Sequence, residues 1–161
     1  MTPHQRTDAV STARKGEGMT TIRQILAGKP EVFAIDPEAT VLDALRLLEE
    51  KNVGALLVMK GPSLLGIFSE RDYARRMILH GRASKETSVR EVMTTEVFTI
   101  EPDATAGECM VHMTDRHIRH LPVLESGCVV GVISIGDIVR TVIEDMRFTI
   151  HQLEGYIRSG G

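Results

Sequence analysis

Two copies of a Ser-x-x-Asp motif are the residues of this chain best suited to chemistry. Ser69 and Asp72 lie in "GIFSERD", and Ser134 and Asp137 lie in "GVISIGD". A carboxylate can accept hydrogen bonds from both hydroxyls of a ribose, and a Ser hydroxyl with the free amides of a helix N-terminus can bind a phosphate. Either Asp alone is explained by an N-cap, in which a side-chain oxygen satisfies the first helical amides. The matched Ser in both copies favours a nucleotide site.

The motif is doubled because the whole segment that contains it is doubled. The stretch "VFAIDPEAT" resembles "VFTIEPDAT" further along the chain. Pro37 pairs with Pro102, so the copies are offset by 65 residues, and this offset holds without a gap from Val32 to Ile143. Upstream, "TTIRQIL" resembles "TSVREVM" with the offset longer by two residues. An internal repeat of this regularity points to two equivalent structural units.

Each copy predicts the same order of elements, which is a strand, a helix, two strands and a closing helix. Pro ends the first strand because it lacks the amide that a sheet ladder needs. Thr40 in the first copy and Thr105 in the second can then cap the next helix through the hydroxyl. The Ser-x-x-Asp motif lies where the last strand meets the closing helix.

One such unit is too small to bury both faces of its sheet. We therefore expect an α/β fold in which two β-α-β-β-α repeats pack sheet to sheet with pseudo-twofold symmetry, followed by a long C-terminal helix. The predicted division of the chain is a flexible N-terminal tail at 1–19, a first repeat at 20–83, a second repeat at 84–145 and a C-terminal helical extension at 146–161.

The composition suits a compact globular domain and gives no sign of a nucleic-acid or membrane partner. The chain has 161 residues, of which 42% are hydrophobic and 25% charged, and its formal net charge is −3. Arg and Lys are interspersed with Asp and Glu, whereas a duplex-binding protein usually shows a basic face. No apolar run approaches the roughly 20 residues that span a bilayer, and the N-terminal segment lacks the apolar core of a secretory signal. We expect a cytoplasmic protein in which Cys109 and Cys128 are free thiols.

The repeated segments resemble a tandem pair of CBS (cystathionine β-synthase) domains. "GIFSERD" and "GVISIGD" match the family pattern Gly-apolar-apolar-Ser/Thr-x-x-Asp, while "VGALLV" and "IRHLPV" match the segment before the last hairpin. The resemblance implies a regulatory binding module, not an enzyme, with two clefts between the repeats for adenosine-containing ligands. AMP is the first expectation, and ATP, ADP, NAD(H) and S-adenosylmethionine are the others. No metal is expected.

The resemblance also implies which residues form each cleft, because each ligand would lie between an adenine side from one repeat and an Asp from the other. Cleft one would combine Ala34, Val53 and Gly54 with Ser134 and Asp137. Cleft two would combine Thr94, Thr99, Ile118 and Arg119 with Ser69, Arg71 and Asp72. His120 would lie with Arg119 near the phosphate positions. Arg71 has Gly136 as its counterpart, so the clefts are not chemically equivalent.

The residues do not support two other classes of function. A nucleic-acid-associated regulator would need a basic stripe, which the sequence does not supply. A nucleotide-hydrolysing enzyme would need a phosphate cradle such as G-x-x-x-x-G-K-[ST], or a base beside a metal-carboxylate cluster, and neither is visible. His112, His117 and His120 are divided between a helix and the next strand, with no cysteines at ligand spacing, so they do not indicate a metal site.

The C-terminal segment carries a heptad pattern of apolar residues. Its positions are Val139, Ile143, Met146, Ile150, Leu153 and Ile157. This spacing predicts one long helix with an apolar seam. A helix folded back on its own domain would explain the seam, but it is longer than a CBS repeat needs. We expect a homodimer through the CBS faces and this helix. We also expect the module to act on an unidentified effector protein.

Overall fold

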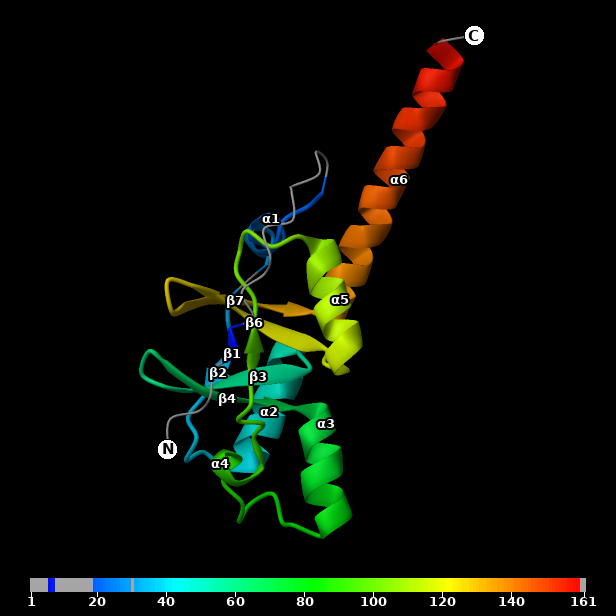
Figure 1. Ribbon diagram of the computed structural model, residues 1–161. Coiled ribbons are helices and arrows are strands. Elements are labelled where there is room, and N and C mark those ends of the chain that lie inside the picture. Colours follow the sequence, from blue (N-terminus) through cyan, green and yellow to red (C-terminus); the bar gives the residue numbers. More distant parts are fainter. Residues whose placement is uncertain (1–5, 8–18, 30, 160–161) are drawn as a thin grey trace.

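The computed structural model describes residues 6–7, 19–29 and 31–159, and Figure 1 shows two stacked units from which one long helix projects. Up to residue 80 the elements are β1 (Arg6–Thr7), α1 (Ile22–Ala27), β2 (Ala34–Ile35), α2 (Val41–Lys51), β3 (Ala55–Lys60), β4 (Ser63–Ser69) and α3 (Glu70–Asp72), which continues into a π-helical turn (Tyr73–Met77) and a 3-10 turn (Ile78–His80). The rest comprises α4 (Val89–Val92), β5 (Phe98–Thr99), α5 (Ala106–Arg116), β6 (His120–Glu125), β7 (Cys128–Ser134) and α6 (Ile135–Ser159). The predicted α/β fold with two repeats and a C-terminal helix is confirmed.

The two hairpins have the same register, as the offset of 65 residues requires. Leu57 in β3 faces Ile67 in β4, and their counterparts Pro122 and Val132 face each other in β6 and β7. Both ladders even shift at the same place, after Val58 in the first hairpin and after Val123 in the second. The first strand of each repeat is shorter than predicted and lies parallel to the first strand of its hairpin.

The predicted Thr caps are present on both central helices. Thr40 Oγ1 accepts a hydrogen bond from the Asp43 amide at 3.1 Å, and Thr105 Oγ1 accepts one from the Glu108 amide at 3.2 Å. Both helices end in a left-handed residue, Asn52 after α2 and His117 after α5. These caps fix where each helix ends and therefore where the next strand enters the region between the repeats.

Each sheet buries one face under its helices and the other against the second repeat. A core cluster within each unit contains residues such as Phe68 in the first and Ile133 in the second. A third cluster joins the units through Leu57, Leu64 and Leu124, with Val97 beside them. This packing is the sheet-to-sheet contact that the small size of one repeat required.

The short helices α1 and α4 cross over between the units (Figure 1). Ile22 of α1 is buried in the core of the second repeat, and its amide donates to the Ala104 carbonyl at 2.8 Å. Val89 of α4 is buried in the core of the first repeat, and its amide donates to the Ala39 carbonyl at 2.9 Å. The connection after each short helix therefore passes beside the Ser-x-x-Asp motif of the other half of the chain.

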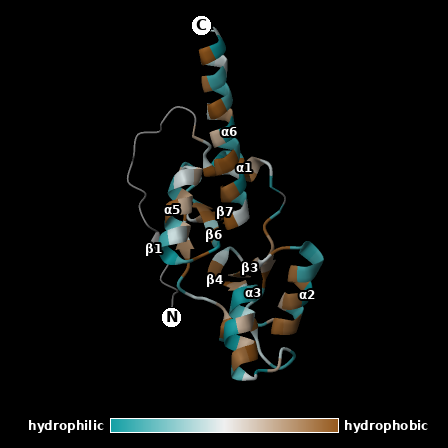
Figure 2. Ribbon diagram, turned by 90° about the vertical axis from the view of Figure 1, so that its right-hand side faces the viewer, coloured by the Kyte–Doolittle hydropathy of each residue, from teal (hydrophilic) through white to brown (hydrophobic). Residues whose placement is uncertain are grey.

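The helix α6 is continuous from the second motif to the described end of the chain, so the boundary predicted at residue 146 falls inside it. Thr20 Oγ1 donates to Asp145 Oδ1 at 2.7 Å, and beyond this contact the helix leaves the body and is not folded back (Figure 2). The seam residues from Ile143 to Ile157 have exposed fractions of 43% to 72%. No helix of the described ranges is long and apolar enough to span a membrane.

Most of the predicted N-terminal tail lies outside the described residues. Within it, β1 pairs in parallel with β5, and Arg6 is the partner of Phe98.

Substitution of Gly66 tests the close approach between β4 and the connection after α4. A Cβ at this position would lie 2.7 Å from the Thr94 backbone oxygen, whereas a Cβ at Gly131 would meet atoms of the flexible Leu26 side chain. We expect Gly66→Ala to lower the free energy of unfolding by about 1–3 kcal/mol, as overpacking of a core does. The matched variant Gly131→Ala should lower the free energy of unfolding by less. Urea denaturation measures both, and equal losses would contradict this reading of the contact.

Candidate functional site

Each Ser-x-x-Asp motif forms a capping box where the last strand of a hairpin becomes a helix. In the first, Ser69 Oγ accepts from the Asp72 amide at 3.2 Å and Asp72 Oδ2 accepts from the Ser69 amide at 3.0 Å. In the second, Ser134 Oγ accepts from the Asp137 amide at 3.2 Å and Asp137 Oδ2 accepts from the Ser134 amide at 2.9 Å. The capping role is therefore present in both copies. The side chains of Asp72 and Asp137 are nevertheless 13% and 14% exposed and line clefts.

The two carboxylates differ in the partner that each receives from the connection after a crossing helix. Asp72 Oδ1 accepts a hydrogen bond from Thr94 Oγ1 at 2.9 Å. Asp137 Oδ2 instead accepts a hydrogen bond from Lys29 Nζ at 2.5 Å. The same ammonium group donates to the Val132 carbonyl at 2.9 Å. The sequence analysis missed Lys29. The offset between the repeats changes by two residues within the connection that carries Lys29. This change was the signal in the sequence that the two connections differ.

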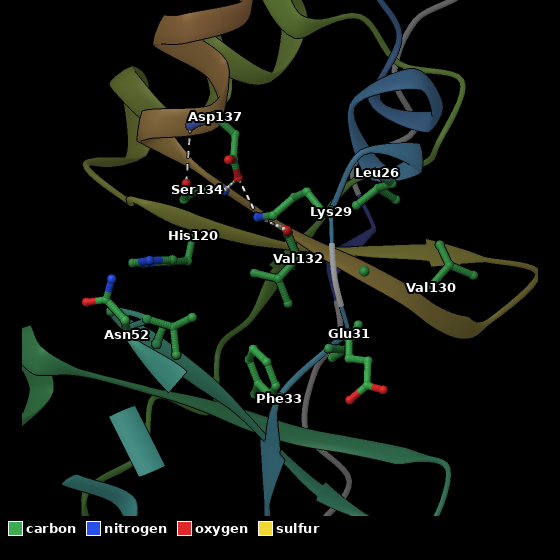
Figure 3. Close-up of a pocket in the computed structure, with 15 residues that line it drawn as sticks. Leu26, Lys29, Glu31, Phe33, Asn52, His120, Val130, Val132, Ser134 and Asp137 are labelled. Atoms are coloured by element: carbon green, nitrogen blue, oxygen red, sulfur yellow. Dashed lines mark hydrogen bonds and ion pairs between the residues drawn. The ribbon is translucent and has the colours of Figure 1, made fainter. Parts of the chain in front are cut away.

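Cleft one lies between the repeats and has a volume of about 620 Å³. That volume is in the range of pockets for small molecules and cofactors. Four of the five predicted residues line it, namely Val53, Gly54, Ser134 and Asp137. Ala34 does not, and its neighbour Phe33 lines the cleft in its place. Figure 3 shows Lys29 reaching between Asp137 and Val132, with Phe33 and Glu31 on the other side of the opening.

Cleft two has a volume of about 590 Å³ and is likewise lined by residues of both repeats. The predicted residues that line it are Ser69, Arg71, Asp72, Thr94, Ile118, Arg119 and His120. Thr99 does not line it; it is buried, and its Oγ1 has no hydrogen-bond partner among the described residues. The sequence analysis missed the further cations Arg75, Arg76 and Arg116.

Arg71 spans cleft two and joins the repeats. Its Nη1 donates to the His117 carbonyl at 2.8 Å, so the start of α3 is bound to the left-handed residue that ends α5. Arg76 is held differently, because its Nη1 donates to the carbonyls of Val92 and Met93 at 3.1 and 2.7 Å. The cationic wall of cleft two thus comes from both halves of the chain.

The two clefts share a wall formed by Gly54 and His120. Both residues line both clefts, and a Cβ at Gly54 would lie 3.3 Å from His120 Cε1. Burial lowers the pKa of His120, and the positive charge of Lys29 lowers it further. The imidazole is therefore neutral at physiological pH and can either donate or accept a hydrogen bond.

Asp137 is ionised at neutral pH in spite of its burial. Burial acts to raise its pKa, but the hydrogen bonds from Lys29 and Ser134 outweigh burial and hold the pKa below its ordinary value. Cleft one therefore presents an ion pair in which the lysine occupies one carboxylate oxygen. The other oxygen, Oδ1, lies beside this ion pair and is the atom that a ribose hydroxyl would meet.

Within the described ranges, no group of three or more His, Cys, Asp or Glu side chains is arranged to hold a metal ion. His112, one of the histidines considered for such a site, has its Nδ1 2.6 Å from Arg116 Nη1.

The Lys29–Asp137 pair makes a pH-dependent contribution to stability that can be measured. Because the pKa of Asp137 is lower in the folded protein, the contribution is complete above the unfolded-state pKa near 4 and is lost as the pH falls through the folded-state pKa. We expect Lys29→Gln to be less stable than wild type at neutral pH and this difference to narrow below about pH 4. Urea midpoints across the pH range measure it.

The exposed pair Lys60–Asp36 provides the control for this measurement. Lys60→Gln should leave stability almost unchanged across the pH range, because exposed ion pairs contribute little. A Lys29→Gln deficit that stays constant from neutral pH to about pH 3 would show that Lys29 acts through Val132 alone.

The profile of the CBS domain matches this chain twice, at residues 22–79 and 89–144. The mitochondrial CBS domain-containing protein CBSX3 of Arabidopsis thaliana is 36% identical over 168 residues, which cover 96% of this chain and 82% of that protein.

Solved structures give the same result. A candidate signal-transduction protein with CBS domains from Burkholderia ambifaria has a TM-score of 0.76 and 47% identity, over 78% of this chain and 96% of the other. A hexameric CBS-CP12 protein from bloom-forming cyanobacteria has a TM-score of 0.68 and 26% identity, over 77% and 72% of the two chains. The tandem repeat, the paired clefts and these matches lead to one conclusion: the chain belongs to the family of CBS-domain proteins.

Proposed function

We propose that this chain is a regulatory module that binds an adenosine-containing ligand, with AMP as the first candidate and ATP, ADP or NAD(H) as the others. One observation carries the proposal: each of two clefts of nucleotide size is lined by residues of both repeats and contains a part-buried Ser-x-x-Asp capping box. The signal-transduction description of the Burkholderia relative supports a regulatory role and not an enzymatic one.

The ribose is the part of the ligand that the carboxylates fit best. The capping box uses Oδ2 of each Asp, so Oδ1 is the atom available to ribose hydroxyls. In cleft two Oδ1 holds the hydroxyl of Thr94, which can itself rotate toward a ligand. In cleft one Oδ1 lies 3.7 Å from Arg140 Nη1, an exposed side chain. The adenine would lie against the strand-end residues of the opposite repeat, Val53 in cleft one and Ile118 in cleft two.

Regulation would follow from the fact that one ligand touches both repeats. A ligand shifts the equilibrium between two arrangements only by its difference in affinity for them. The Arg71–His117 bond is a contact between the repeats that a ligand in cleft two would alter directly. The effector that reads the arrangement is a further protein, which we do not identify.

We also propose that the chain forms a homodimer through its CBS faces and α6. The exposed seam of α6 supports this, because burial of an aliphatic side chain contributes about 1.5–3 kcal/mol. The hexameric cyanobacterial relative shows that proteins with this fold assemble. The cytoplasmic location stays a prediction, since the Arabidopsis relative is mitochondrial.

Calorimetric titration of wild type and of Asp72→Asn and Asp137→Asn tests the nucleotide function. We expect adenosine ligands to bind more tightly than GTP, and each variant to weaken a different site. Loss of one charge-assisted hydrogen bond should cost about 1.5–3 kcal/mol of binding free energy. Variants that unfold more easily in urea but bind nucleotide as wild type does would show that the motifs only cap helices.

Truncation after Met146 tests the role of α6. We expect the truncated chain to sediment as a monomer at concentrations where the full chain is a dimer, and to keep its nucleotide affinity, because the residues that line both clefts precede this point.

Two single substitutions provide the matched control for the truncation. Leu153 lies on the seam and Phe148 on the opposite face, with similar exposed fractions of 58% and 61%. Leu153→Ala should weaken self-association, and Phe148→Ala should leave it unchanged. A full-length monomer, or equal effects of the two substitutions, would contradict a dimer along the seam.

A further inference from the structure

The two clefts carry opposite net charge although they occupy equivalent places in the repeats. Cleft two is lined by five arginines, against which Glu70 and Asp72 supply two negative charges. Cleft one is lined by Lys29, against which Glu31 and Asp137 supply two. With neutral histidines, the formal charge is +3 in cleft two and −1 in cleft one. The lining charges therefore favour a ligand with several phosphates in cleft two over cleft one.

The difference arises from divergence of the repeats and not from the architecture. At the offset of 65 residues, Arg71 corresponds to Gly136 and Arg119 to Gly54, neither of which carries a charge. Arg140 is the counterpart of Arg75, but it does not line cleft one. The counterpart of Arg116 is Lys51, whose Nζ lies 5.3 Å from the centre of the Phe33 ring and outside cleft one.

Two of the arginines in cleft two are available to a ligand. Arg75 and Arg119 are exposed and form no hydrogen bond or ion pair with the described residues. Arg71 and Arg76 donate to backbone carbonyls, and these bonds leave other guanidinium N–H groups free to donate, since each guanidinium has five. Unpaired guanidinium groups in one cleft repel each other, and a chain of phosphates can bind several of them at once.

Among the described residues, cleft one has no such reserve of positive charge. Lys29 is the cation that they place in its lining, and it is 30% exposed and already pairs with Asp137 at 2.5 Å. Glu31 lies on the same connection and adds a negative charge at the cleft. The apolar side chains of Phe33 and Val130 form much of the remaining wall (Figure 3), which suits a base or a nucleoside and not a polyphosphate.

We propose that cleft two binds a nucleoside diphosphate or triphosphate, and that cleft one binds an adenosine ligand with at most one phosphate. The proposal rests on the nucleotide function proposed above and adds which class of ligand each cleft selects. In cleft two the Asp72 carboxylate holds the ribose, and the phosphate chain extends toward Arg75 and Arg119. The protein would then respond to two different adenosine ligands at once.

The test is a calorimetric series with adenosine, AMP, ADP and ATP in metal-free buffer on the full chain. Asp72→Asn and Asp137→Asn assign each binding event to a cleft. At the Asp72-dependent site we expect affinity to rise with each phosphate, by about tenfold or more from AMP to ATP, and the gain to shrink with added salt. At the Asp137-dependent site we expect affinity to be equal or to fall along the same series.

Arg75→Gln with Arg119→Gln should remove the gain from AMP to ATP while adenosine affinity changes by less than about threefold, because these exposed side chains contact phosphates and not the nucleoside. Arg140→Gln, the counterpart of the Arg75 change, is the matched control and should keep the gain. Unchanged urea midpoints exclude unfolding as the cause.

The outcomes separate this inference from the proposed function. A flat series at the Asp72-dependent site, or a steeper one at the Asp137-dependent site, would overturn the inference while nucleotide binding stands. Inorganic tripolyphosphate that binds as tightly as ATP would overturn the choice of a nucleoside ligand in cleft two. No binding of any of the four ligands would overturn the proposed function itself.

Discussion

The structure depends on the need of each small sheet to bury its second face. Three-stranded and two-stranded sheets with helices on one side leave an apolar face that water would otherwise contact. The two repeats solve this by packing these faces together through Leu57, Leu64 and Leu124. The crossing of α1 and α4 adds backbone hydrogen bonds between sequence halves, such as that from Ile22 to Ala104. Because both repeats are fixed in this way, the connections after α1 and α4 are brought to the Asp of the opposite motif.

Much of the fold could be predicted because it follows from local sequence patterns that occur twice. Each such pattern depends on residues within a few positions of one another. The patterns are the Pro that ends the first strand, the Thr that caps the next helix, the hairpin pairing and the Ser-x-x-Asp motif between strand and helix. The 65-residue offset transferred every such feature from one half to the other. The crossing of the short helices could not be predicted, since it depends on tertiary packing of Ile22 and Val89 and not on any local preference.

The site was predicted less completely than the fold, for two physical reasons. Lys29 reaches Asp137 because α1 crosses to the second repeat, so no pattern around Asp137 indicates it. The Ala34 and Thr99 assignments came from resemblance, and neighbouring residues of a strand point to opposite faces. An error of one position therefore exchanges Ala34 for Phe33, which is the residue that lines the cleft.

The helix α6 starts within the capping box of cleft one, and this gives the long helix a mechanical role. At 1.5 Å per residue its 25 residues extend about 37 Å from Ile135 to Ser159. A tilt of about 5° at the base would displace the far end by about 3 Å, because the lever arm is the rise per residue times the number of residues. A ligand bound at Asp137, as proposed above, would act on the first turn of this helix. The rod would then convert a local change of hydrogen bonds into a movement that a distant surface could detect.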